Sequence, residues 1–287
     1  MSDTIARVPQ QIEPNTEQIL TRTTPRRRAS AGALLRELVV SLWLPVVLFA
    51  LWWFVSSTST SPFFPPLSRI LEQWWSEFII GDSVHHVFSS LQNFALGYVL
   101  GALIGIIGGT LLWRYRFLRQ GTNPIVYFLY VLPAPALLPA MIALFGIGQT
   151  RQVALIAFGA VWPTLLNTLD GMRGIDQVKF DTAKAMRLGP TRTLFSLVFR
   201  GASPQIAAGL RASLQVALIL MVVTEMVAAK EGIGYFILQA QIVFSSVKVW
   251  AGIIMLVIIG TLLNYLFVFI EHRVLSWYYR SRALGNS

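Results

Sequence analysis

Six apolar stretches, each about as long as a transmembrane helix, dominate this sequence. They cover residues 38–55, 87–113, 123–145, 152–169, 206–228 and 249–270. A helix needs about 20 such residues to cross the hydrocarbon core of a bilayer. Charged residues make up 13% of the chain, against about 25% in soluble domains. The two-residue alternation of membrane β-strands is not evident. The sequence therefore predicts an all-α, polytopic membrane helical bundle with six transmembrane helices.

The basic residues predict the orientation of this bundle. Of the 23 Lys and Arg, 19 fall in the two tails and in the second and fourth connections, and 4 in the remaining connections. Cytoplasmic segments carry the excess of Lys and Arg in membrane proteins. Both termini and the long connection 171–204 are therefore expected in the cytoplasm. The net charge of +10 fits basic loops beside anionic lipid and does not require nucleic acid.

Composition along the chain predicts three regions. Residues 1–37 are polar and basic, with the run Arg26, Arg27 and Arg28, and are expected to form a cytoplasmic tail. Residues 38–280 form the six-span domain, and residues 281–287 a short C-terminal tail. The first apolar stretch begins too far from the start for a cleaved signal peptide. We expect a multi-pass protein of the plasma membrane.

Motifs for catalysis and cofactor binding are missing from the sequence. It contains no G-x-x-x-x-G-K-[ST] phosphate loop, no H-E-x-x-H and no G-x-S-x-G, and it has no cysteine. The pair His85 and His86 has no carboxylates at metal-ligand spacing and is expected to lie at a membrane interface. We predict no catalytic residue, no metal site and no cofactor bound by this chain.

Two features inside the predicted spans are candidates for function. Glu225 lies late in the fifth span, where an ionisable group is costly; it either lines a translocation path or gate, or makes a structural hydrogen bond. Pro133, Pro135 and Pro139 interrupt the third span, which predicts a kinked or discontinuous helix. Broken helices at membrane depth often line a cavity. The Gly97, Gly101 and Gly105 series has G-x-x-x-G spacing and predicts close helix packing.

The cytoplasmic connection 171–204 is too long for a turn and is helix-permissive. Phe180, Ala183 and Met186 are spaced as one helical face, and a second helix-like segment follows Gly189-Pro190. Glycine suits a helix end and proline the first turn of a new helix. The sequence predicts two short helices that either dock on a soluble partner or lie against the bundle.

Several stretches of the sequence match a known pattern. They are Asp181-Thr182-Ala183, Leu197-Val198-Phe199-Arg200, Pro204 to Arg211, Glu225-Met226 with Gly232-Ile233-Gly234-Tyr235, Pro133 to Pro139 with Phe145-Gly146-Ile147-Gly148, and Phe64-Pro65-Pro66. The first two resemble the coupling loop of the permeases of binding-protein-dependent ABC importers, whose pattern is E-A-A, three residues, G, nine residues, then I-x-L-P. Pro204 to Arg211 resembles the P-x-I-x-x-G-L-R stretch of the same family. The other stretches also resemble this family, and those before residue 150 resemble its nitrate, sulfonate and taurine branch.

The resemblance implies a non-catalytic permease subunit that imports a small, anionic solute and works as a homodimer. Its implied partners are two cytoplasmic ATP-binding subunits, an extracytoplasmic solute-binding protein and membrane lipid, with ATP held by the partner subunits. The candidate residues of a path or gate, chosen from their positions inside the predicted spans, are Pro133, Pro135 and Glu225. The implied ATPase-coupling residues are Asp181, Thr182, Ala183, Met186, Arg187, Gly189 and Pro190.

Two other functions are compatible with the residues. A secondary transporter driven by an ion gradient would need ion-coordinating polar groups in broken helices. The second function is that of a non-transporting membrane scaffold that recruits an ATPase. It is compatible with the sequence because Arg187 and Arg200 replace the glycine and the final proline of the family's coupling pattern.

The replacement at Arg187 also predicts a displaced turn. Arginine is a good helix former and is poorly suited to positive φ. We therefore expect the first coupling helix to continue through Arg187 and to end near Gly189, with Pro190 starting the second.

Overall fold

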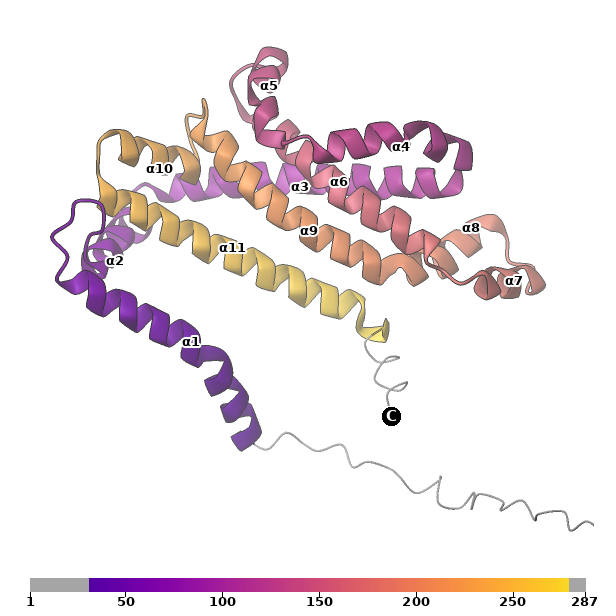
Figure 1. Cartoon of the computed structure of the whole chain (residues 1–287), viewed down its shortest axis with the longest axis horizontal. Helices are drawn as coiled ribbons and strands as arrows, with labels where there is room; N and C mark the ends of the chain where they lie inside the picture. Colours follow the sequence, from indigo (N-terminus) through magenta and orange to yellow (C-terminus); the bar gives the residue numbers. More distant parts are fainter. Residues whose placement is uncertain (1–30, 279–287) are drawn as a thin grey trace, which may run out of the picture. The chain divides into compact units, whose positions relative to one another are not determined.

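The computed structural model describes the backbone of residues 31–278 and the side chains of residues 43–278. Regular structure in this part of the chain is entirely helical, as predicted (Figure 1). The helices are α1 (Ala31–Ser57), α2 (Leu67–Trp75), the π-helix η2 (Ser76–Ile80), α3 (Val84–Arg114), α4 (Arg116–Val131), the 3₁₀ helix η3 (Ala134–Leu137), α5 (Leu138–Phe145), α6 (Gln149–Arg173), α7 (Gln177–Ala185), α8 (Pro190–Thr193), the π-helix η4 (Leu194–Val198), α9 (Phe199–Met226), α10 (Ile233–Ile242) and α11 (Ser246–Val274).

The chain divides into two compact units, residues 1–54 and 55–287. The first contains most of α1, whose residues 31–37 were predicted to belong to the polar tail. The rest of that tail, residues 1–30, and the C-terminal tail lie outside the described residues. The packing below is that of the second unit.

Four described helical segments are long and apolar enough to cross a membrane. They are α3, α6, the stretch Pro190–Met226 and α11. Helix α4 and the η3–α5 segment meet at a bend of 92°. They add a fifth segment if this bent pair counts as one span. The predicted discontinuity of the third span is therefore confirmed. The described apolar part of α1, Trp43–Ser57, is shorter than a full span.

Glycines bring α3 and α6 into close contact, as the G-x-x-x-G spacing predicted. A Cβ atom added to Gly101 would lie 2.6 Å from the Ala157 carbonyl oxygen, and one added to Gly105 would lie 2.7 Å from Cβ of Thr164. Without side chains at these positions the two backbones can approach closely. Dispersion contacts then replace the hydrophobic driving force that lipid does not supply.

Polar side chains fix α9 against this pair of helices. The Thr164 and Ser213 hydroxyls lie 2.5 Å apart, and Ser213 also donates to the Ala160 carbonyl at 2.9 Å. The Tyr98 hydroxyl of α3 donates to the Leu210 carbonyl of α9 at 3.0 Å. Such interhelical bonds satisfy polar groups that lipid cannot. Helices α3, α6 and α9 therefore form a three-helix core that is linked by hydrogen bonds between the helices.

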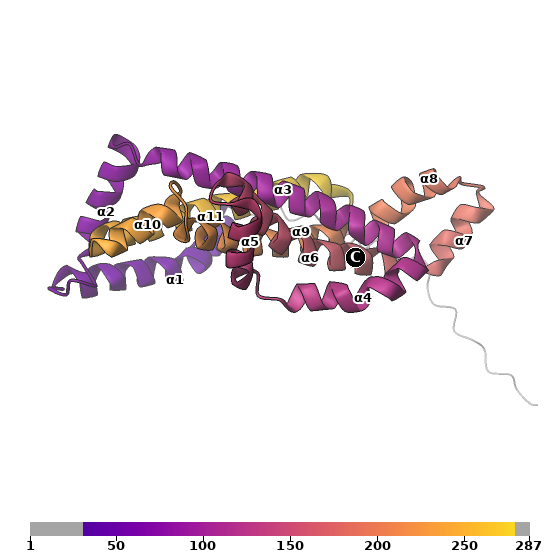
Figure 2. The ribbon, with the colours of Figure 1, turned by 90° about the horizontal axis from the view of Figure 1, so that it is seen from above.

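Short helices extend the core at both of its ends (Figure 2). One end carries the short helices α7 and α8, and the other carries α2 and α10. At the α2 end, Lys248 of α11 forms a 2.8 Å ion pair with Glu77. Burial raises the pKa of Glu77, but the hydrogen bonds from Lys248, Ser83 and Gln73 outweigh this effect, so its pKa lies below the ordinary value. The ion pair ties η2 to α11.

Candidate functional site: coupling hairpin and translocation path

Helices α7 and α8 and the turn between them, residues 177–193, form a hairpin at one end of the core, which we name the coupling hairpin after its predicted role. The Asp176 carboxylate accepts a hydrogen bond from the Val178 backbone N–H at 3.0 Å and caps α7. Pro190 occupies the first turn of α8, as predicted. All seven predicted coupling residues lie in this hairpin. Met186 is 68% exposed, whereas Ala183 is buried.

The turn of the hairpin lies at Arg187, so the prediction that α7 continues to Gly189 is wrong. Helix α7 ends at Ala185, and Arg187 has a φ of 53°. The Arg187 N–H donates to the Lys184 carbonyl and the Leu188 N–H to the Ala183 carbonyl, which is the Schellman arrangement. These bonds offset the cost of about 1–2 kcal/mol for a left-handed arginine. Gly189 is extended, with φ −64° and ψ 160°.

The hairpin is packed on the inner helices and does not hang free. The Phe180 ring of α7 stacks on Trp113 of α3, with centroids 6.3 Å apart. Phe180 also packs against a buried cluster that contains Met172 of α6 and Val198 of η4, the segment that follows the hairpin. A displacement of the hairpin would therefore be carried into α3, α6 and α9.

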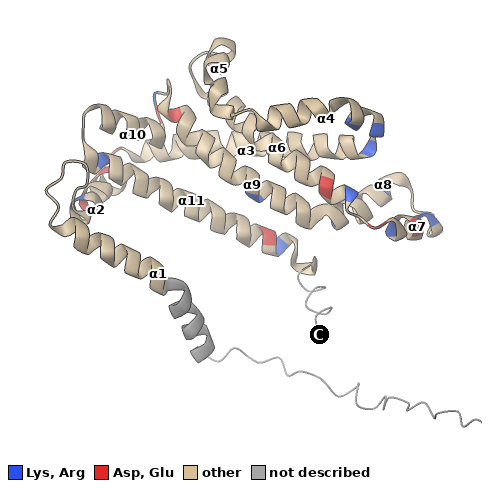
Figure 3. Cartoon of the chain, viewed as in Figure 1, with Lys and Arg blue, Asp and Glu red and all other residues tan. Residues whose placement is uncertain are grey.

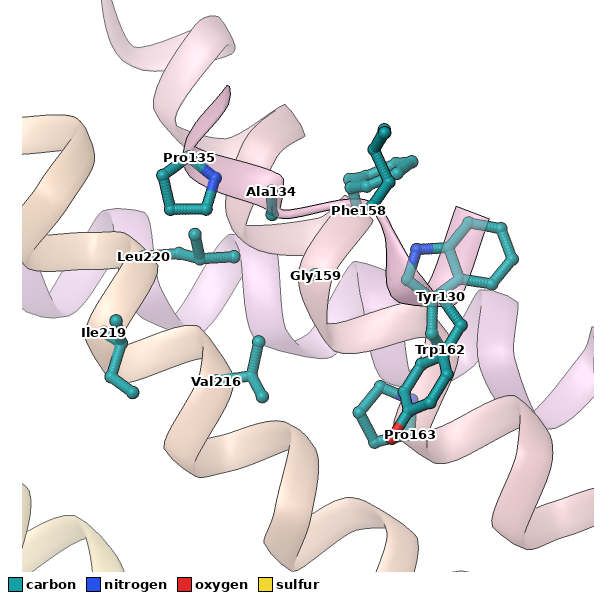
Figure 4. Close-up of a pocket in the computed structure, with 11 residues that line it drawn as sticks. Tyr130, Ala134, Pro135, Phe158, Gly159, Trp162, Pro163, Val216, Ile219 and Leu220 are labelled. Atoms are coloured by element: carbon teal, nitrogen blue, oxygen red, sulfur yellow. The ribbon is translucent and has the colours of Figure 1, made fainter. Parts of the chain in front are cut away.

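The break in the third span borders a small apolar cavity (Figure 4). Its volume is about 200 Å³, and Pro135 is part of its lining. Pro133 caps η3 and is not part of that lining. The remaining lining residues come from the end of α4 and the break after it, from α6 and from α9: Tyr130, Leu132 and Ala134; Phe158, Gly159, Trp162 and Pro163; and Val216, Ile219 and Leu220.

A larger, polar cavity of about 600 Å³ lies at the other end of the core from the hairpin. Its lining includes Asn93 of α3 and Gln152 of α6, which are nearly buried and hydrogen-bonded to each other. Exposed Lys230 and Glu231 border it from the turn after α9. The side-chain amides of Asn93 and Gln152 are hydrogen-bonding groups in the wall of this cavity, and its rim carries one basic and one acidic side chain.

Glu225 is fully buried in a hydrogen-bond network next to this end of the core. Its Oε2 accepts bonds from the Ser90 hydroxyl and from the Gly234 N–H, both at 2.9 Å. Ser90 in turn accepts from the Ile233 N–H at 2.9 Å. Glu225 is not among the described residues that line the two cavities. This geometry matches the structural alternative, and a role in a path or gate stays a prediction.

Gly232 allows the chain to turn closely over Glu225. Its φ of +116° is unfavourable for any residue with a side chain, and a Cβ there would lie 2.6 Å from Glu225 Oε2. The Gly232 N–H donates to Nδ1 of His86 at 3.2 Å. The α9–α10 turn is thus held on α3 by main-chain and side-chain bonds together.

Arg151 holds the C-terminal end of α9 from the other side, a role that sequence reasoning missed. Its side chain is fully buried, and Nη2 donates to the Thr224 and Ala228 carbonyls, each at 3.2 Å. A cation at a helix C-terminus is favourable. The same reasoning missed the bonds of Ser90 and His86 to the α9–α10 turn. A lone arginine at the start of an apolar span was the available signal for Arg151.

Charged residues are unevenly distributed along the helices (Figure 3). Lys and Arg gather at the turn from α3 to α4 and around α7, and the middle of α3 and α6 carries none. The part of the chain that the structure describes contains no cluster of three or more His, Asp or Glu side chains that could hold a metal ion.

Comparison with known proteins gives the family of the chain. A family model described as "Binding-protein-dependent transport system inner membrane component" matches residues 97–276. The chain is 30% identical over 240 residues to the putative aliphatic sulfonates transport permease protein SsuC of Bacillus subtilis (strain 168), covering 82% of this chain and 86% of that protein. It is 29% identical over 260 residues to the taurine transport system permease protein TauC of Escherichia coli (strain K12), covering 88% and 94%.

Two further similarities agree with these. The nitrate import permease protein NrtB of Synechococcus elongatus is 28% identical over 207 residues, covering 69% of this chain and 74% of that protein. The fold is similar to that of a chain in the structure titled "Inward facing conformations of the MetNI methionine ABC transporter". The TM-score is 0.58 at 19% identity, over 68% of this chain and 94% of the other.

The apolar helices long enough to cross a membrane and the family match together define a helical membrane permease. The chain belongs to the binding-protein-dependent transport system inner membrane component family, and it is the permease subunit of an ABC importer. The predicted resemblance to the nitrate, sulfonate and taurine branch is confirmed.

The turn at Arg187 makes a testable prediction. Arg187→Pro should break the hairpin, because proline fixes φ near −65° and lacks the N–H that bonds Lys184. Arg187→Gly should keep the turn and stabilise it by up to about 1 kcal/mol. Co-purification of the ATPase subunits with the permease should be lost only in the proline variant. Gln177→Pro is the matched control, because it places a proline at the first position of α7, where proline is tolerated and the preceding Asp176 is already extended. Wild-type ATPase association in Arg187→Pro would contradict the assigned turn.

The network around Glu225 makes a second prediction. Glu225→Gln keeps an oxygen that can accept from Ser90 and Gly234, so the variant should accumulate in the membrane like the wild type. Glu225→Leu leaves buried donors without an acceptor and should lose about 3 kcal/mol of stability. Membrane accumulation and thermal unfolding in detergent measure both effects. Glu231→Leu, which removes a nearby exposed carboxylate, should accumulate normally. Equal stability of Glu225→Leu and the wild type would show that the network is dispensable.

Proposed function

We propose that two copies of this chain form the translocation path of an importer for a small anionic solute of the sulfonate, taurine or nitrate kind. Each copy crosses the membrane six times, with both termini and the coupling hairpin in the cytoplasm. Two ATP-binding subunits seat the hairpins, and an extracytoplasmic binding protein delivers the solute. The relatives named for sulfonate, taurine and nitrate transport support the choice of solute.

The observation that carries this proposal is the continuous helical stretch Pro190–Met226. It begins in the coupling hairpin and ends at the turn held by Glu225 and Arg151. A push on the hairpin is therefore transmitted along one element to the opposite end of the core. The π-helical segment η4 lies where this stretch leaves the hairpin, and π-helical turns inside helices occur frequently at functional sites.

The chain itself carries out no chemistry in this scheme. ATP is bound and hydrolysed by the partner subunits, and this chain takes no cofactor. Closure of the ATPase pair moves the hairpins, and the path changes between inward-facing and outward-facing states. The two states must differ in their contacts with the ATPase for ATP to bias them.

The surface of α4 supports a paired arrangement. Ile125, Phe128 and Val131 are each more than half exposed in the single chain. The Pro135 cavity lies between the end of α4 and helices α6 and α9. A second copy packed near α4 would place this cavity beside the shared path. Pro133 and Pro135 would then lie at the helix break next to the path, and Glu225 would lie near the extracytoplasmic end of the path without lining the cavity.

Uptake into proteoliposomes tests the proposed function. The transporter is purified with the partners that accompany it, and the binding protein is screened for retention of taurine, ethanesulfonate or nitrate. Uptake of the retained solute should require ATP inside the vesicles, should stop with a hydrolysis-deficient ATPase, and should survive an ionophore. Uptake that persists without ATP and collapses with the ionophore would instead indicate a secondary transporter. Absence of a binding protein and of uptake would indicate a scaffold.

A further inference from the structure

A groove of about 400 Å³ separates the inner end of α3 from the coupling hairpin. Its walls are mostly apolar, and the polar members of its lining are Thr191, Thr193 and one basic residue, Arg114. The other lining residues are Trp113, Phe180, Pro190, Leu194 and Val198. An apolar groove with a cation in its lining is chemically matched to an amphiphile with an anionic head.

The charges around the groove are not balanced by acids. Residues 83–169 contain no Asp or Glu. Among the described residues, the Arg114 guanidinium lies 5.7 Å from the centre of the Tyr115 ring, and no carboxylate is within salt-bridge distance of it. Arg116 and Arg119 follow within the next turn of α4, and the acid of the nearby hairpin, Asp181, is paired with Lys184 at 3.3 Å.

The position of the groove selects the membrane as the source of that amphiphile. Arg114 is the last residue of a membrane-crossing helix, and Trp113 beside it is a residue type enriched at the membrane interface. Phe117, at the start of α4, is 91% exposed, as expected for a side chain that meets acyl chains. Basic pockets between transmembrane helices on the cytoplasmic side bind anionic head groups.

We propose that this groove binds one anionic phospholipid of the inner leaflet, with its phosphate at Arg114 and its acyl region along Trp113 and Phe180. The bound lipid contacts both α3 and α8, so it fixes the position of the coupling hairpin relative to the membrane core. The inference rests on the cytoplasmic placement of the hairpin given under the proposed function, but lipid binding does not depend on transport.

Quenching of Trp113 fluorescence tests the site in the whole transporter complex. The complex is placed in nanodiscs that contain phosphatidylcholine with either brominated phosphatidylglycerol or brominated phosphatidylcholine. The Trp113 contribution is the difference between the wild type and Trp113→Phe. We expect quenching of Trp113 to favour phosphatidylglycerol about fivefold, the effect of one cation near the surface, and Arg114→Gln to abolish the preference.

Arg192→Gln is the matched control, because it removes the same charge from the hairpin but from a residue outside the lining. It should keep the preference. Thr191→Phe, which narrows the groove without adding a tryptophan, should lower Trp113 quenching by both lipids and serves if Arg114→Gln does not accumulate.

Several results would overturn the proposal. Equal quenching by both brominated lipids would mean unselective contact with acyl chains. Loss of preference in Arg192→Gln to the same degree would mean a diffuse basic surface. Displacement by soluble glycerol 3-phosphate would mean a cytosolic ligand, and no quenching of Trp113 at all would mean that protein covers the groove. Each outcome is readable even if uptake of every tested solute fails.

Discussion

The close approach of α3 and α6 is the constraint on which the rest of the core depends. Lipid gives no hydrophobic driving force for helices to associate, so contact has to come from small residues and internal polar bonds. Gly101 and Gly105 let the backbones meet. That approach brings Asn93 within reach of Gln152 at one end and Trp113 within reach of Phe180 at the other. The polar cavity and the seat of the coupling hairpin both follow from it.

The continuous helical stretch Pro190–Met226 connects the two ends of this packed core. Its first residues belong to the hairpin, and its last turn is held by bonds from Arg151 and through Glu225. A helix restrained at both ends cannot take up a displacement by fraying, so it has to tilt or shift against α6. The Thr164 and Ser213 contact is where such a shift would be felt. Coupling over this distance then needs only a core with two packed arrangements.

Much of this could be predicted from the sequence, because apolar length, proline and glycine act locally. The broken third span, the close α3–α6 packing and the restart at Pro190 are of this kind. The turn at Arg187 could not be predicted from residue preference, since two main-chain bonds outweigh the cost of its φ. Ser90, which bonds Glu225, lies 135 residues away in the chain, and Thr224, which bonds Arg151, lies 73 residues away. Their pairing depends on tertiary packing, which local patterns do not encode.

The central claim is that the coupling hairpin and the Glu225 end of the core lie on opposite sides of the membrane. The chain contains no cysteine, so single cysteines can be introduced at Thr191 in α8 and at Ser245 before α11 without interference. A membrane-impermeant thiol reagent applied to intact cells should label the Ser245→Cys variant and leave Thr191→Cys unlabelled until the membrane is opened. Labelling of Thr191→Cys in intact cells, or protection of Ser245→Cys there, would contradict the account.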